Sequence, residues 1–105
     1  MDDKIKGMLG LAMRAGCVTD GTERALNEIR KKNSSLVLLD SAASANTVKQ
    51  VRDKCAFYGC TVITVPAGLL DASLGKSGRM AAAIKKGGFD TRLRELLEQD
   101  GSSAK

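Results

Sequence analysis

The organisation of the chain is decided by residues 14–32, RAGCVTDGTERALNEIRKK, which join the end of one helix to the start of the next. Gly16 suits the left-handed conformation that ends helices, and Cys17 to Thr19 favour extended backbone. Asp20 is a good capping residue, so the second helix is expected to begin at Gly21. Because helix N–H groups beside a glycine attract anions, this turn is a candidate phosphate or RNA-backbone site; an ordinary strand-to-helix turn is the alternative.

The composition indicates a compact domain with an aliphatic core. The chain has 105 residues, of which 43% are hydrophobic and only 3% aromatic, and it contains no Trp. A chain of this length suits one domain with an adequate core. The scarcity of aromatic side chains disfavours RNA recognition by base stacking on an aromatic platform. We expect one domain over residues 1–99, followed by a disordered polar tail over residues 100–105.

The net charge of the chain indicates which kinds of partner it can bind. Its net charge is +5, and the excess of Lys and Arg lies within residues 1–86. A basic domain without an apolar surface segment is a candidate polyanion binder, although an excess of Lys also serves solubility alone. No apolar run reaches the roughly 20 residues that a membrane helix needs, so we expect a soluble protein and no membrane partner.

The residue types disfavour an enzyme. The chain has no His, and its three cysteines, Cys17, Cys55 and Cys60, lack CxxC spacing. We therefore expect free thiols in a cytoplasmic protein, and neither a metal site nor a cofactor. Gly75-Lys76-Ser77 is similar to the end of a nucleotide-binding P-loop, but Leu70 stands where that loop needs a glycine.

The hydrophobic pattern predicts alternating helices and strands. Leu36–Leu39 and Thr61–Val65 are apolar runs typical of strands buried on both faces, and we expect both to be central strands. A last strand is expected within 79–84, although its alanines favour helix. The expected helices lie at about 2–15, 21–31, 46–58, 67–73 and 89–99. With a short strand at 17–19, this order predicts a three-layer α/β/α sandwich.

Several of these segments together resemble a known family. They are LGLAMRAG at 9–16, Gly21-Thr22, the strand at 36–39, SANT at 44–47, DKC at 53–55, LGK at 74–76 and Gly88-Phe89. In this order and spacing, over about residues 5–97, they resemble the kink-turn-binding ribosomal protein family of the L-seven-Ae and L-thirty-e type, in its small bacterial form. The resemblance implies a mixed four-stranded sheet between helices and a non-catalytic, ribosome-associated RNA-binding protein.

The resemblance also implies where RNA binds. In the family, the start of the second helix holds tandem sheared G·A pairs through a Gly-Thr-Asn-Glu pattern followed by a Lys. The matching positions here are Gly21, Thr22, Glu23, Arg24 and Asn27, of which the last three depart from the usual Asn, Glu and Lys. In the third loop, Asp71 replaces a usual glycine, and the segment at 40–42 lacks the usual acidic pair.

Charge adds four residues to this candidate site. We expect Lys31, Lys32, Lys76 and Arg79 to flank the helix start and contact phosphates, while Arg24 reaches a guanine edge in an opened groove. The expected partner is a structured RNA, ribosomal RNA included, bound by a monomer, and DNA is not expected. The alternative is a protein-interaction module on the same fold that has lost RNA binding, for which the departures at Glu23, Arg24 and Asn27 are the evidence.

Overall fold

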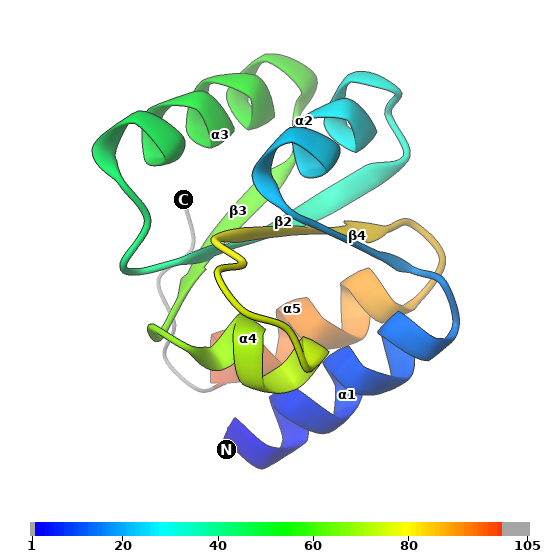
Figure 1. Cartoon of the computed structure of the whole chain (residues 1–105). Coiled ribbons are helices and arrows are strands. Elements are labelled where there is room, and N and C mark those ends of the chain that lie inside the picture. Colours follow the sequence, from blue (N-terminus) through cyan, green and yellow to red (C-terminus); the bar gives the residue numbers. More distant parts are fainter. Residues whose placement is uncertain (1, 100–105) are drawn as a thin grey trace.

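The computed structural model describes residues 2–99, which form a mixed four-stranded sheet between two layers of helices (Figure 1). This arrangement confirms the predicted α/β/α sandwich and the predicted order of elements. The elements are α1 (Asp2–Arg14), β1 (Val18–Asp20), α2 (Thr22–Arg30), β2 (Ser34–Asp40), α3 (Ala45–Tyr58), β3 (Thr61–Val65), α4 (Leu69–Leu74), β4 (Ala81–Lys85) and α5 (Phe89–Gln99). The predicted tail at 100–105 lies outside the described residues.

The sheet separates two hydrophobic cores. Side chains alternate between the faces of a strand, so Leu36 and Leu38 of β2 pack with α1, α4 and α5, whereas Val37 and Leu39 pack with α2 and α3. Figure 1 shows α2 and α3 together on one side of the sheet and the other three helices on the opposite side. A strand buried on both faces needs an unbroken apolar run, which the sequence of β2 supplies.

The expectation that β3 is a central strand is wrong. The strand order is β1-β4-β2-β3, with β2 and β3 parallel and the other pairs antiparallel, so β3 lies at an edge and β2 is central. Val62 and Ile63 are nonetheless buried on opposite faces of β3, in the two different cores. An apolar run indicates that both faces of a strand are covered by other residues. It does not indicate whether both edges of the strand are hydrogen-bonded to neighbouring strands.

Two helix boundaries follow from local chemistry that the sequence displays. Ser44 caps α3 by accepting a hydrogen bond from the backbone N–H of Thr47 at 3.2 Å, and Gly59 ends the same helix in the left-handed conformation.

Backbone contacts gather the loops that follow β1, β2 and β3 at one end of the sheet. The N–H of Gly21 donates to the carbonyl of Ala81 at 2.9 Å, which joins the end of β1 to the start of β4. The buried carboxylate of Asp40 accepts N–H groups from Ala42 at 2.7 Å and from Gly68 at 3.1 Å. We call this the Gly21 end, and the opposite end, where β2 and β3 begin and β4 stops, the Lys86 end.

The alanines of β4 are needed for close packing. Ala83 is 1% exposed and belongs to the core beneath α2 and α3. Replacing it with Leu overpacks this core, so we expect Ala83→Leu to lower the free energy of unfolding by about 1–3 kcal/mol in urea titrations. The matched change Thr91→Leu, on the exposed face of α5, should alter it by no more than about 0.5 kcal/mol. Equal urea midpoints for the two variants would contradict this account of β4.

The three cysteines are free thiols that differ in burial. Burial, with a smaller contribution from Cys60, raises the pKa of Cys55 to about 12, so at pH 8 this thiol is almost entirely protonated. We expect iodoacetamide to modify Cys55 last in the folded protein, and all three cysteines to react without reductant once urea unfolds it. Peptide mass spectrometry measures both. Modification of Cys55 in the folded protein as fast as in urea would show that it is not buried.

Candidate functional site

The start of α2 is an open helix end. Gly21 precedes the helix with φ 95° and ψ 141°, a conformation that residues with a side chain rarely adopt. Among residues 2–99, no side chain caps α2, so the expectation that Asp20 caps it is wrong. The first N–H groups of α2 therefore keep their capacity to bind an acceptor from outside, and they carry the positive end of the helix dipole.

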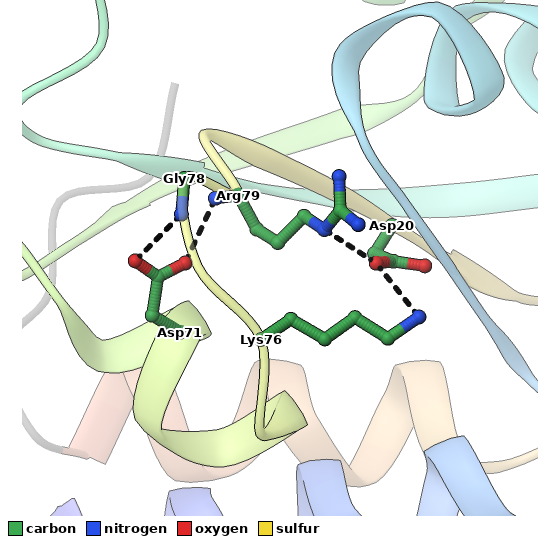
Figure 2. Close-up of polar contacts among 5 residues, drawn as sticks. All are labelled: Asp20, Asp71, Lys76, Gly78 and Arg79. Atoms are coloured by element: carbon green, nitrogen blue, oxygen red, sulfur yellow. Dashed lines mark hydrogen bonds and ion pairs between the residues drawn. The ribbon is translucent and has the colours of Figure 1, made fainter.

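Asp20 instead forms an ion cluster with the loop before β4, in which the carboxylate is buried and the two cations are partly exposed. Its carboxylate, 4% exposed at the end of β1, lies 3.3 Å from Nζ of Lys76 and 2.9 Å from Nε of Arg79 (Figure 2). The Arg79 contact is an ion pair without hydrogen-bond alignment. Burial disfavours the charged carboxylate, but Lys76, together with the charge of Arg79, outweighs burial and holds the pKa of Asp20 below its usual value.

Asp71 positions the loop that carries both cations. From α4, one of its carboxylate oxygens accepts the N–H of Gly78 at 3.0 Å and the other accepts the N–H of Arg79 at 2.8 Å (Figure 2). Sequence reasoning treated Asp71 only as a departure from the family pattern. The contact joins a helix side chain to backbone N–H groups of a loop beyond the end of α4, and a loop has no hydrophobic periodicity that could have revealed it.

Five of the predicted residues meet at one hollow. It has a volume of about 430 Å³ and is lined by Asp20, Gly21, Thr22, Glu23, Arg24 and Arg79. The guanidinium of Arg79 lies over the glycine, since a Cβ atom at Gly21 would be 4.0 Å from its Nη1 atom. Lys76 joins this group through Asp20. The hollow thus combines an uncapped helix start with two arginines and two carboxylates, a composition suited to phosphate and to base edges.

Three predicted residues lie away from this hollow. Asn27 stands one turn further along α2, where its Oδ1 atom accepts a hydrogen bond from Nη1 of Arg30 at 3.0 Å. Lys31 and Lys32 follow the last residue of α2, which has nine residues and is thus about 13 Å long. The expectation that these lysines flank the helix start is therefore wrong, because the length of α2 separates them from Gly21 and Thr22.

A larger hollow, about 560 Å³, lies between α2 and α3. Its lining includes Leu26, Tyr58 and the exposed ring of Phe57, and it reaches the helix start only at Glu23.

Within the described range 2–99, no group of three metal-binding side chains is found, and none of the helices there has the length and hydropathy of a membrane span.

The ion cluster predicts an acid-dependent stability. Because the folded pKa of Asp20 lies below its unfolded value, the cluster stabilises the fold at neutral pH, and this stability is lost as the pH falls below about 4. We expect Asp20→Asn to lower the free energy of unfolding by about 1–2 kcal/mol at pH 7, since Lys76 and Arg79 are partly exposed.

Urea titrations across pH measure this difference between the parent and Asp20→Asn, which should shrink in acid. Asp53→Asn is the control, because the pair of Asp53 with Lys49 is exposed on the surface of α3 and its loss should cost at most about 0.5 kcal/mol. A difference between the parent and Asp20→Asn that stays constant from pH 7 to strong acid would show that ionised Asp20 does not stabilise the fold.

Two relatives align along most of the chain. The RNA-binding protein YlxQ of Bacillus subtilis (strain 168) is 40% identical over 92 residues, which cover 87% of this chain and 92% of the relative. The RNA-binding protein YlxQ of Enterococcus faecium is 34% identical over 97 residues, which cover 90% of this chain and 92% of the relative. No protein-family model matches the chain.

Two solved structures share the fold. A protein of unknown function from Bacillus halodurans C superposes with a TM-score of 0.85 at 32% identity, covering 90% of this chain and 97% of that one. The 15.5kD RNA binding protein of Giardia lamblia superposes with a TM-score of 0.71 at 16% identity, covering 90% and 82%. Given the identity to two YlxQ proteins along most of both lengths, the chain belongs to the YlxQ family.

Proposed function

We propose that this protein is a non-catalytic RNA-binding protein that holds structured RNA at its Gly21 end. The observation that carries the proposal is the uncapped start of α2 beneath the guanidinium of Arg79. The names of the two YlxQ relatives support RNA as the ligand, since both are called RNA-binding proteins.

Gly21 and Arg79 are placed to contact the RNA backbone in different ways. Gly21 has no side chain, so a sugar-phosphate backbone can approach the first N–H groups of α2, where the helix dipole favours an anion. Arg79 is held over this point by Asp20 and by Asp71. Because its position is fixed before RNA arrives, little side-chain freedom is lost when it contacts a phosphate.

Arg24 and Glu23 supply the directional contacts. Arg24 is exposed in the first turn of α2 and, within residues 2–99, forms no ion pair. Its planar guanidinium can bind the O6 and N7 atoms of a guanine. The carboxylate of Glu23 repels phosphates but accepts hydrogen bonds from base amino groups. RNA bound here therefore presents base edges to Glu23 and Arg24 and its backbone to Gly21 and Arg79.

This division favours a kinked or looped RNA over a plain duplex. The major groove of an A-form duplex is too deep and narrow for a side chain to read, whereas kinks and loops open base edges. Kink-turn-like RNA, ribosomal RNA included, is the proposed target.

The three free cysteines fit a reducing compartment. The proposed assembly is one copy of the protein on one RNA, rather than DNA, in the cytoplasm, in association with the ribosome.

Replacing Arg24 tests the proposal at its most exposed contact. We expect Arg24→Gln to weaken binding to a kink-turn RNA by about 1–3 kcal/mol and to weaken binding to a plain duplex less, because only the kinked RNA offers a guanine edge. Filter binding or fluorescence anisotropy at a fixed salt concentration measures both. The matched control Arg92→Gln removes the same charge from the surface of α5 and should leave both affinities nearly unchanged.

The same measurement decides against the alternative of a protein-interaction module. Such a module would show no saturable, salt-sensitive binding to any structured RNA in the parent protein. If the parent binds but Arg24→Gln and Arg92→Gln behave alike, the protein binds RNA and the start of α2 is not the site. Arg24 serves better than Gly21 in this test, because a side chain at the positive φ of Gly21 would strain the fold itself.

A further inference from the structure

We propose that Lys31, Lys32, Lys85 and Lys86, which we call the lysine cluster, form a second contact for the RNA backbone at the Lys86 end. The inference rests on the proposed function, and it adds a site at the opposite end of the sheet from Gly21. Its ligand is the sugar-phosphate backbone of duplex RNA that flanks the structured element held at the Gly21 end.

The cluster is assembled by the fold from two segments that are far apart in the sequence. The N–H of Lys86 donates to the carbonyl of Asn33 at 3.1 Å, and the N–H of Lys85 donates to the carbonyl of Cys17 at 2.8 Å. The first bond brings the end of β4 against the turn between α2 and β2, and the second joins it to the segment before β1. Lys32, Asn33, Lys85 and Lys86 line a hollow of about 310 Å³, and all four lysines of the cluster are exposed.

No lysine of the cluster forms an ion pair with a carboxylate of the described part of the chain. Ion pairs among residues 2–99 engage Lys49, Lys76, Arg79 and Arg92, and none engages a member of the cluster. Like charges brought together in this way repel each other and destabilise the fold slightly. An external polyanion removes the repulsion, and the release of its counterions adds to the affinity.

The backbone at Lys32 gives a second, independent observation. Lys32 has φ 61°, the one positive φ among the non-glycine residues that the structure describes. The N–H of Lys32 donates to the carbonyl of Ile29 and that of Asn33 to the carbonyl of Glu28, so Lys32 occupies the position of a helix end that glycine usually fills. A lysine here is strained, and strain retained on the surface points to a use for the side chain.

The chemistry of the hollow favours phosphates over bases. Lysine ammonium groups are compact point charges without the planar geometry that reads a base edge, and the lining contains no aromatic ring on which a base could stack. The contact is therefore independent of sequence. The greatest extent of the molecule is 30 Å, which is comparable to roughly one helical turn of a duplex, so a stem that extends by about one turn can run from the Gly21 end to the lysine cluster.

The test compares two RNAs and two matched double variants. One RNA is a kink-turn with minimal stems, and the other carries the same kink-turn with its stems extended by about ten base pairs. Lys85→Gln/Lys86→Gln removes two charges of the cluster, and Lys4→Gln/Lys6→Gln removes two exposed charges from α1. The affinity of the parent and of each double variant for each RNA is measured as a function of salt concentration.

We expect the parent to bind the extended RNA more tightly and with a steeper dependence on salt than the minimal RNA. Lys85→Gln/Lys86→Gln should reduce the salt slope on the extended RNA by up to about two units and leave the minimal RNA unaffected. Lys4→Gln/Lys6→Gln should change neither slope appreciably. Equal slopes for the parent and for Lys85→Gln/Lys86→Gln on the extended RNA would overturn the proposal.

Lys32→Gly separates this contact from an effect on folding. Glycine relieves the positive φ, so the variant should unfold at a higher temperature than the parent and yet bind the extended RNA more weakly. Unchanged binding by Lys32→Gly would count against the cluster. If the parent binds the minimal RNA normally and the extension adds nothing, this inference fails while the proposed function stands; if the parent binds neither RNA, both fail.

An anionic membrane surface is another polyanion that the lysine cluster could bind, and vesicles of anionic lipid test this. Since the lining of the hollow lacks an apolar side chain that could enter a bilayer, we expect vesicles not to compete with the extended RNA at physiological salt. Loss of vesicle binding, but not of RNA binding, in Lys85→Gln/Lys86→Gln would reassign the cluster to a membrane surface and overturn the proposal.

Discussion

The candidate site depends on one buried carboxylate. Asp20 ends β1 immediately before Gly21, and its pairing with Lys76 and Arg79 fixes the loop before β4 against the start of α2. Had Asp20 capped α2, the helix start would have been satisfied internally and closed to a ligand. The ion cluster thus leaves the N–H groups of α2 available and places a guanidinium beside them. One buried interaction links the stability of this end of the sheet to its capacity to bind an anion.

The fold was predictable from the sequence because its signals are local. Gly16 and Gly59 end helices in the left-handed conformation, Ser44 caps α3, and the apolar run of β2 reports its burial. Strand order, in contrast, is not set by local signals. The run at Thr61–Val65 indicated coverage of both faces, but hydrogen-bond partners across a sheet are set by contacts between distant segments, so its edge position was not visible.

The candidate site was predictable in part for the same reason. Gly21, Thr22, Glu23 and Arg24 are consecutive, and a resemblance between short motifs was enough to find them. Asp20 and Asp71 act through the loop at 75–80, and their roles needed the tertiary structure. Lys31 and Lys32 were grouped with the helix start by charge alone, although the length of α2 separates them from it. The contacts that hold the site in place were thus harder to predict than the residues that form its surface.

The edge position of β3 has a consequence for how the protein tolerates change. Within residues 2–99, β3 pairs only with β2, so one row of its N–H and C=O groups is left without a strand partner. Its sequence, TVITV, has high β-propensity and no charge, which is the composition of segments that pair with a second chain. Pro66, immediately after the strand, limits its extension. Changes that loosen α3 from this strand would therefore reduce the yield of protein through aggregation before they altered any contact with a ligand.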